Sequence, residues 1–245
     1  MTSLILFIFS FILPIHLDMP LSDVQESNQT RLIVDHSAWN SILQKYVQEN
    51  GRVNYATLRK DRRILDTYLK FLSQNHPDAS WSREEQMAFW INAYNAYTIV
   101  LILDNYPLSS ITQLEGGKVW DKKWITIGNK RYSLNNIEND ILRPQFQDPR
   151  IHFAVNCAAK SCPPLHNRAF TASNLDTLLD KQTKAFINDE TYNKITKKAV
   201  TVSKIFDWYA EDFSDLIGYL NDYSNTAIQS NAAIKFTEYD WSLNE

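Results

Sequence analysis

The sequence predicts an α+β fold: a mostly helical single domain with a buried central helix and a small, partly antiparallel sheet. Three observations lead to this class. Helical patterns outnumber strand patterns, and the strands do not alternate regularly with helices as in a doubly wound sheet. No repeat, linker or low-complexity stretch divides the chain. Hydrophobic residues make up 44% of the 245 residues, enough for a core without disulfide bonds.

The first residues predict export. An apolar run from Leu4 to Leu13, followed by Pro14, is too short to cross a bilayer comfortably and stands where a secretory signal carries its apolar segment. We therefore expect a signal peptide over residues 1–17, an irregular lead-in over residues 18–35, and one domain over residues 36–245. No basic residue precedes the run and no clear cleavage motif follows it, so an uncleaved anchor is the alternative. The expected location is secreted or periplasmic, with no stable membrane span in the mature chain.

Two helical patterns come before the central helix. Ser37 to Gln48 places its apolar residues on one face and ends at Asn50-Gly51, where glycine allows a left-handed residue. A short extended piece, Val53 to Tyr55, leads to the second helical stretch, Leu58 to Ser73. The loop composition of His76-Pro77-Asp78 ends this part of the chain.

The central helix has the clearest start signal. Ser82 and Glu85 have the spacing of a capping box, in which each side chain takes a backbone N–H that the first turn leaves unpaired. The helix runs to about Asn105, and Pro107 follows. Apolar residues cover most of its circumference, which indicates a helix surrounded by protein.

Shorter elements fill the second half. Gly128-Asn129, between two short β patterns from Trp124 to Ser133, predicts a hairpin with a tight turn. The other expected elements are a helix from Ser133 to Leu142 that ends near Pro144, a strand from Ile151 to Asn156, a helix from Ser173 to Asn188, a strand from Lys198 to Ser203, and one or two helices from Ile205 to Tyr219.

Charge excludes one class of partner. The formal net charge is -3, and acidic and basic residues are mixed along the chain without a basic patch for phosphate backbones. We therefore expect no nucleic-acid partner. An envelope component or a small-molecule ligand is the expected kind of partner, and no cofactor is expected.

Both cysteines lie in the segment Arg150 to Pro164, and four interpretations of them stay open. They form a local disulfide in an oxidising compartment, they are two buried free thiols, or Cys157 is a nucleophile at the end of a strand. In the fourth interpretation His152, Cys157, Cys162 and His166 bind zinc. Because their spacing lacks the C-x2-C pair of specific zinc motifs, no metal site is expected.

The nucleophile hypothesis needs partners for Cys157. His152 is the nearest candidate base, but on an ideal strand a residue five positions away points to the opposite face, so a pairing needs a bend. Asn92 and Asn95 share one face of the central helix, in apolar surroundings. They either bond neighbouring backbone or orient a catalytic group, for example as an oxyanion contact. Asp207 and Asp212, which flank Trp208-Tyr209, are interpreted as part of a solvated helix face or cap.

Four blocks of the sequence stand out in this order: Phe89-Trp90-Ile91-Asn92-Ala93-Tyr94-Asn95-Ala96, Ser133-Leu134-Asn135-Asn136-Ile137-Glu138, Arg150-Ile151-His152-Phe153-Ala154 with Cys157 and Ser161-Cys162-Pro163, and Ser203-Lys204-Ile205-Phe206-Asp207-Trp208-Tyr209 with Asp212-Phe213. Together they closely resemble the family called domain of unknown function 547. The resemblance covers about Trp39 to Tyr223 and implies a single-domain exported protein like the bacterial members, but it implies no activity. Members of the family often carry His after the Ile-Glu pair, where this chain has Asn139.

Two functions remain in view. The first is an exported envelope binding or structural module, whose fold the Arg150–Pro164 segment braces. The alternative is a cysteine-dependent hydrolase or acyl-transfer enzyme with Cys157 as nucleophile, His152 as base, and Asn92 or Asn95 as orienting groups.

Overall fold

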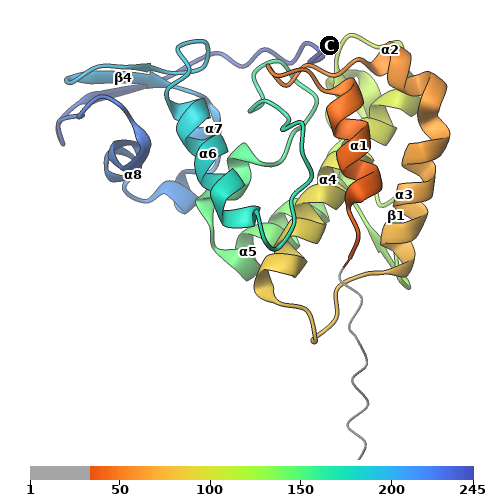
Figure 1. Cartoon of the computed structure of the whole chain (residues 1–245). Coiled ribbons are helices and arrows are strands. Elements are labelled where there is room, and N and C mark those ends of the chain that lie inside the picture. Colours follow the sequence, from red (N-terminus) through yellow and green to blue (C-terminus); the bar gives the residue numbers. More distant parts are fainter. Residues whose placement is uncertain (1–33) are drawn as a thin grey trace, which may run out of the picture. The chain divides into compact units, whose positions relative to one another are not determined.

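A computed structural model describes residues 34–245 and confirms the α+β class (Figure 1). The predicted signal peptide, and the lead-in as far as residue 33, lie outside the described residues. Helices dominate, and the strands form two small sheets, one of them antiparallel and the other mixed. Within residues 34–245, no helix is both long enough and apolar enough to cross a membrane.

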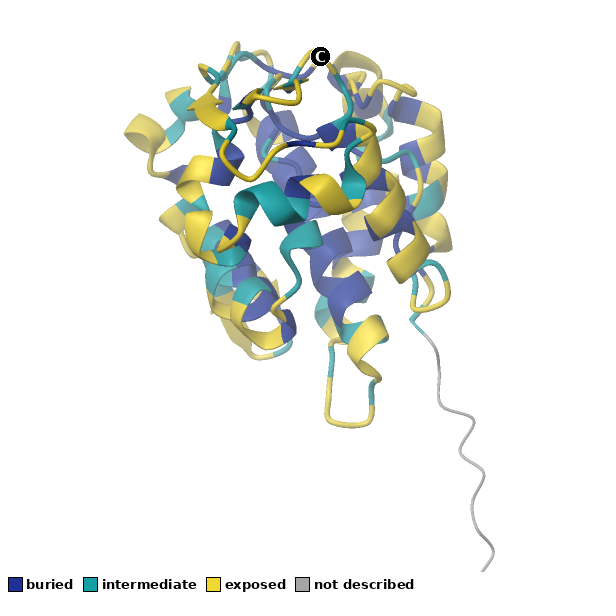
Figure 2. Ribbon diagram, turned by 90° about the vertical axis from the view of Figure 1, so that its left-hand side faces the viewer, coloured by how far each residue is buried: buried dark blue, intermediate teal, exposed yellow. Residues whose placement is uncertain are grey.

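The central helix is α4, Arg83–Asn105, as predicted. The Ser82 hydroxyl accepts a hydrogen bond from the Glu85 N–H and the Glu85 carboxylate accepts one from the Ser82 N–H, so the capping box is confirmed. All residues from Met87 to Leu103 are buried. Figure 2 shows this buried helix passing through the middle of the domain, inside more exposed segments.

The first helices pack beside α4 in an order close to the prediction. Helix α1, Ser37–Tyr46, contacts α3, Arg62–Gln74, and α3 contacts α4. The expected helix from Leu58 to Ser73 is divided, because the four-residue α2, Tyr55–Leu58, and the 3-10 turn η1, Arg59–Asp61, precede α3.

The predicted hairpin is confirmed. Strands β1, Ile125–Ile127, and β2, Lys130–Tyr132, are antiparallel, and Gly128 at the turn has a φ of 57°. Two 3-10 segments, η2 (Ile111–Gly117) and η3 (Val119–Asp121), lead into it.

The helix predicted after Ser133 exists but extends past its expected end. It begins as the π-helical segment η4, Asn136–Leu142, and continues as α5, Arg143–Phe146, so the prediction that it ends near Pro144 is wrong. Pro144 stands in the first turn of α5, directly after the π-helical segment, and the first turn is where a helix tolerates proline. Gln147, with a φ of 48°, ends the helix instead.

The strand predicted from Ile151 to Asn156 is wrong. The chain forms the 3-10 helix η5, Pro149–Phe153, because the Asp148 side chain accepts the Arg150 N–H and Pro149 occupies the first turn. A short apolar run does not distinguish a buried strand from a buried helix. The tighter helix changes which side chains share a face, so the argument that His152 and Cys157 point apart no longer applies.

The last third contains the mixed sheet. Strand β4, Ala199–Val202, confirms the predicted strand. It pairs antiparallel with β3, Lys194–Ile195, and parallel with β5, Ala233–Phe236. The predicted helices also form. The elements of this region are α6 (Leu175–Ile187), β3 (Lys194–Ile195), β4, α7 (Ile205–Trp208), the 3-10 turn η6 (Ala210–Phe213), α8 (Leu216–Tyr223) and β5 (Ala233–Phe236).

A buried histidine at the start of α1 makes the stability depend on pH. Burial lowers the pKa of His36 to about 4, from a usual 6.5, while its Nδ1 lies 2.7 Å from the Tyr68 hydroxyl. Between these pKa values the unfolded chain binds a proton that the folded chain does not, so stability falls as the pH drops from 6.5 towards 4. The loss expected from this group is about 3 kcal/mol.

Urea denaturation at a series of pH values tests this expectation. The His36→Gln variant keeps a polar side chain but cannot titrate, so its stability should fall less than that of the parent chain over the same pH range. The difference between the two chains removes the contribution of the carboxylates, which also titrate there. Parallel pH profiles for the two chains would contradict the expectation.

Candidate functional site

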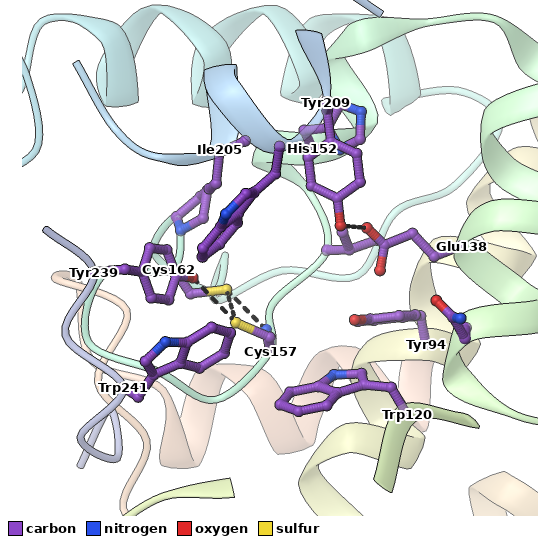
Figure 3. A pocket seen from close by; sticks show the side chains of 14 residues that line it. Tyr94, Trp120, Glu138, His152, Cys157, Cys162, Ile205, Tyr209, Tyr239 and Trp241 are labelled. Carbon is purple, nitrogen blue, oxygen red and sulfur yellow. Dashed lines mark hydrogen bonds between the residues drawn. The ribbon is translucent and has the colours of Figure 1, made fainter. Parts of the chain in front are cut away.

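A pocket of about 170 Å³ contains both cysteines and His152 (Figure 3). Residues far apart in the sequence line it, from α4, η4, the 157–163 turn, α7 and the last residues of the chain. Among residues 34–245, no lysine or arginine lines it. Its walls are largely aromatic and include Tyr94, Trp120, Trp208, Tyr209, Tyr239 and Trp241.

The two thiols form the centre of the site. Both cysteines are free, and their Sγ atoms lie 2.7 Å apart. The Cys157 N–H donates to the Cys162 Sγ over 2.8 Å, while the Tyr239 hydroxyl lies 3.2 Å from the Cys157 Sγ. Cys162 also accepts from the backbone. At 2.7 Å the two sulfur atoms are closer than van der Waals contact, so in the reduced state they share one proton, with Cys162 as the donor, and in the oxidised state they need little movement to form a disulfide.

Electrostatics separate the two thiols. The hydrogen bond from Cys162 lowers the pKa of Cys157, the Tyr239 hydroxyl and the Ala159 backbone N–H lower it further, and burial acts against them. Burial raises the pKa of Cys162 well above its usual value. Cys157 is thus the thiol that ionises first, and Cys162 stays protonated as its donor.

A strained turn holds Cys157 in place. Ala158 is buried and has a φ of 63°, a left-handed conformation that alanine rarely adopts. The Asn156 Oδ1 accepts hydrogen bonds from the Ala158 N–H and from the Asn244 side chain, and the Asn244 N–H donates to the Ala158 carbonyl. The C-terminal residues therefore fix the backbone of the turn.

His152 lies on the pocket wall inside a second polar group. Its Nε2 is 2.6 Å from the Asp212 Oδ2, and the guanidinium of Arg143 donates to both oxygens of that carboxylate. The hydrogen bond from His152, and that from Arg143, hold the pKa of Asp212 well below its usual range. The His152 ring packs on the ring of Tyr209 at a centroid distance of 4.0 Å. Asp212 is therefore not a solvated cap, as the sequence suggested, but fixes the orientation of the imidazole.

Two further polar groups face the pocket. The Tyr209 hydroxyl donates to the Oε1 of Glu138 over 2.6 Å, and Glu138 is buried on η4. Tyr94, on α4, is 1% exposed, and its hydroxyl has no hydrogen-bond partner among residues 34–245. In Figure 3 Tyr94 and Glu138 lie across the pocket from the two sulfur atoms. Burial raises the pKa of Tyr94 well above its usual value, so the hydroxyl keeps its proton.

The structure separates the residues that the sequence grouped. Cys157 and His152 line one pocket, but no hydrogen bond joins them in the described part of the chain. Asn92 and Asn95 do not line it. Each asparagine bonds one backbone carbonyl and one backbone N–H: Asn92 those of Phe170, and Asn95 the Ala154 carbonyl and the Asn156 N–H. Asn95 thus positions the chain just before Cys157.

The four residues of the zinc interpretation, His152, Cys157, Cys162 and His166, are not arranged around a common point. Within the described residues, no group of three or more His, Cys, Asp or Glu side chains is arranged to hold a metal ion. The Nδ1 of His166 accepts the Arg168 N–H, while His152 bonds Asp212. Asn139, at the position where the family often has His, is bonded to Asn135 and Arg143.

Sequence reasoning missed several residues of the site. Glu138 lies inside the block Ser133 to Glu138. The one sequence signal for its role is a charged residue among the apolar positions of a helical pattern. Asn156 is polar within an apolar run, which could have marked it. Tyr239 and Asn244 contact the turn around Cys157 only in the folded chain, so no local sequence pattern could have identified them.

Fold and site together define a mostly helical α+β domain with an aromatic pocket around a polarised thiol pair. Residues 79–187 match the model of the family described as "Protein of unknown function, DUF547". The resemblance seen in the sequence is thus confirmed over these residues. The match contains Glu138, His152 and both cysteines, whereas the block from Ser203 to Phe213 lies beyond it. Comparison with curated proteins and with solved structures finds no match to the chain.

Proposed function

We propose that this chain is a cysteine-dependent hydrolase or acyl-transfer enzyme with Cys157 as its nucleophile. One observation carries the proposal: the Cys157 Sγ lies in a pocket wall where Cys162 and Tyr239 are within hydrogen-bond distance of it. Donors around a sulfur stabilise its anion, and the thiolate is the reactive form. A cysteine pair that only braces a turn has no need of a pocket or of a lowered pKa.

The reaction divides into two steps. The Cys157 thiolate attacks the carbonyl carbon of an ester, thioester or amide, forms an S–C bond and moves an electron pair onto the oxygen. When that pair returns, the bond to the leaving group breaks, the leaving group departs with the bonding electrons and takes a proton from water, and an acyl-enzyme remains. Water then attacks in hydrolysis, or a second nucleophile in transfer, and Cys157 is released as thiolate.

The other side chains of the pocket take supporting roles. The unpaired Tyr94 hydroxyl is the donor available for the developing oxyanion. Because the Nε2 of His152 is bonded to Asp212, the Nδ1 is the nitrogen left to exchange a proton with substrate or water. The role of His152 as general base is thus kept, although it acts on the reacting molecule rather than through a direct bond to Cys157. Asn95 is a positioning residue in this scheme.

The second candidate is the envelope binding or structural module. Its support is the aromatic rim, because Trp208 is 46% exposed and stacks with Trp241, as side chains that receive a ligand often do. Export, which rests on the leader alone, also suits this role. In an oxidising compartment the neighbouring thiols would join as a disulfide, and we take the free pair as the active state.

Alkylation of native, reduced protein with iodoacetamide tests the nucleophile. We expect Cys157 to react at pH 6 to 7 faster than an ordinary free thiol, because its lowered pKa raises the thiolate fraction, and we expect Cys162 to stay unlabelled. Peptide mass spectrometry identifies the labelled residue. Cys157→Ser should fold and lose the fast reaction.

Two variants at Cys162 serve as matched controls. Cys162→Ser keeps a hydroxyl donor near the Cys157 sulfur and should keep most of the reactivity, whereas Cys162→Ala removes the donor and should shift the labelling profile to higher pH. A Cys157 that resists labelling in reduced, native protein would leave the binding module as the better account. Labelling that appears only after added reductant would show that the isolated protein carries the disulfide.

A further inference from the structure

We propose that Glu138 and the aromatic walls of the pocket form a subsite for a positively charged nitrogen, so that the substrate is a small carbonyl compound with an ammonium or amidinium group. The inference rests on the proposed function, since it assigns the class of substrate that Cys157 attacks. The thiolate and the subsite are separate groups in one pocket, and each can be tested without the other.

Glu138 is a buried carboxylate without a cationic partner. It is 6% exposed, and the Tyr209 hydroxyl donates to its Oε1. No lysine, arginine or histidine forms an ion pair with it in the part of the chain that the structure describes. Arg143, just after η4, directs its guanidinium to Asp212 instead. Burying a carboxylate costs on the order of several kcal/mol unless a cation or enough hydrogen bonds compensate for the lost hydration. A ligand cation would supply this missing partner.

The walls around this carboxylate favour the same charge. Trp120, Tyr94 and Trp208 line the pocket, and the faces of such rings attract ammonium and guanidinium groups. Lysine and arginine, which would repel a cation, do not line it. An anionic ligand would meet both the carboxylate and the Cys157 thiolate. A neutral ligand would leave Glu138 with the Tyr209 hydrogen bond and the charge of Arg143, which is bonded to Asp212, but without an ion pair of its own.

The relative positions fix where the reacting atom would lie. Figure 3 shows Glu138 and the Cys157 sulfur on opposite sides of the pocket, with Trp120 along one wall between them. A cationic nitrogen bound at Glu138 therefore directs the rest of a small molecule towards Cys157. The pocket, of about 170 Å³, suits a compact compound with few atoms between its nitrogen and its carbonyl carbon.

Three alkylating reagents of different charge test the subsite on the full chain. They are 2-bromoethylamine, iodoacetamide and iodoacetate, which are cationic, neutral and anionic. In each case the Cys157 sulfur bonds to carbon while the carbon–halogen bond breaks and halide leaves with the bonding electrons. Rates at Cys157 are divided by the rates with N-acetylcysteine amide, which removes the intrinsic differences between the reagents.

The expected result is a preference for the cation. After this correction the cationic reagent should exceed the anionic one by about tenfold or more, which corresponds to about 1.4 kcal/mol of electrostatic discrimination. Glu138→Gln should abolish most of the preference. Because Glu138 also raises the pKa of Cys157, the variant should react faster with the neutral and anionic reagents, and the ratio of rates cancels this effect of the pKa. Glu211→Gln, which removes an exposed carboxylate outside the pocket, should keep the parent ratio.

The outcomes separate the two proposals. A Cys157 that reacts with none of the reagents overturns the proposed function, whereas fast reaction with iodoacetamide and no charge preference overturns the subsite alone. If Glu138→Gln fails to fold, the parent chain still decides the matter, through protection of Cys157 from iodoacetamide. Benzylamine should protect at concentrations where benzyl alcohol does not, and equal protection by the two would also overturn the subsite.

Discussion

Replacing Trp90 with alanine should lower the free energy of unfolding by about 3 to 5 kcal/mol, the usual cost of removing a large buried aromatic side chain. Trp90 lies on α4 and is 6% exposed. Its ring meets those of Phe89 and Tyr132 edge to face, at centroid distances of 5.2 and 5.4 Å. The substitution leaves a cavity between the central helix and the hairpin, because no other side chain takes the place of the indole ring. Urea denaturation followed by circular dichroism measures the loss.

Trp208→Ala is the matched control for this experiment. Trp208 is 46% exposed at the rim of the pocket, so its loss should cost less than about 1 kcal/mol. A Trp90→Ala variant that is as stable as Trp208→Ala would contradict the placement of Trp90, on α4, in the hydrophobic core.

The central helix could be predicted because its signals are local. A capping box, a stopping proline and apolar residues on all sides lie within one stretch of sequence, and each depends only on neighbours along the chain. The hairpin at Gly128 was predictable for the same reason. The strand proposed from Ile151 to Asn156 failed because hydrophobicity marks burial without fixing backbone conformation, and here Asp148 and Pro149 begin a 3-10 turn.

The strands that were missed have little pattern of their own. Strand β3 has two residues, and all four residues of β5 are exposed, so neither shows the alternation that marks a half-buried strand. Their pairing with β4 is a tertiary event. The same is true of the site, where Cys157 and His152 could be identified by type while Tyr239 and Asn244 are brought to them by the return of the chain's last residues.

Asn92 and Asn95 allow the structural and functional roles of α4 to be separated. Each is nearly fully buried and bonds a backbone N–H and a carbonyl of a distant segment. Alanine at either position leaves both backbone groups unpaired, so each variant should lose about 2 to 5 kcal/mol of stability. Only Asn95 contacts the segment that leads into Cys157.

The two variants should therefore lose similar stability and differ in the chemistry of the thiol. In Asn95→Ala the Asn156 N–H loses its hydrogen-bond acceptor, so the donors around the Cys157 sulfur are no longer held in place. The rate of iodoacetamide labelling at pH 6 to 7 should fall by about tenfold, which corresponds to a loss of about 1.4 kcal/mol of thiolate stabilisation. The Asn92 side chain forms no hydrogen bond with that turn, so Asn92→Ala should be labelled at the same rate as the parent chain. Measurements at a temperature where both variants remain folded make the comparison fair. Equal labelling of the parent chain and both variants would show that Asn156 and Asn244 hold Cys157 in place without Asn95. If both variants lost labelling equally, any weakening of the core would be enough to disturb the site.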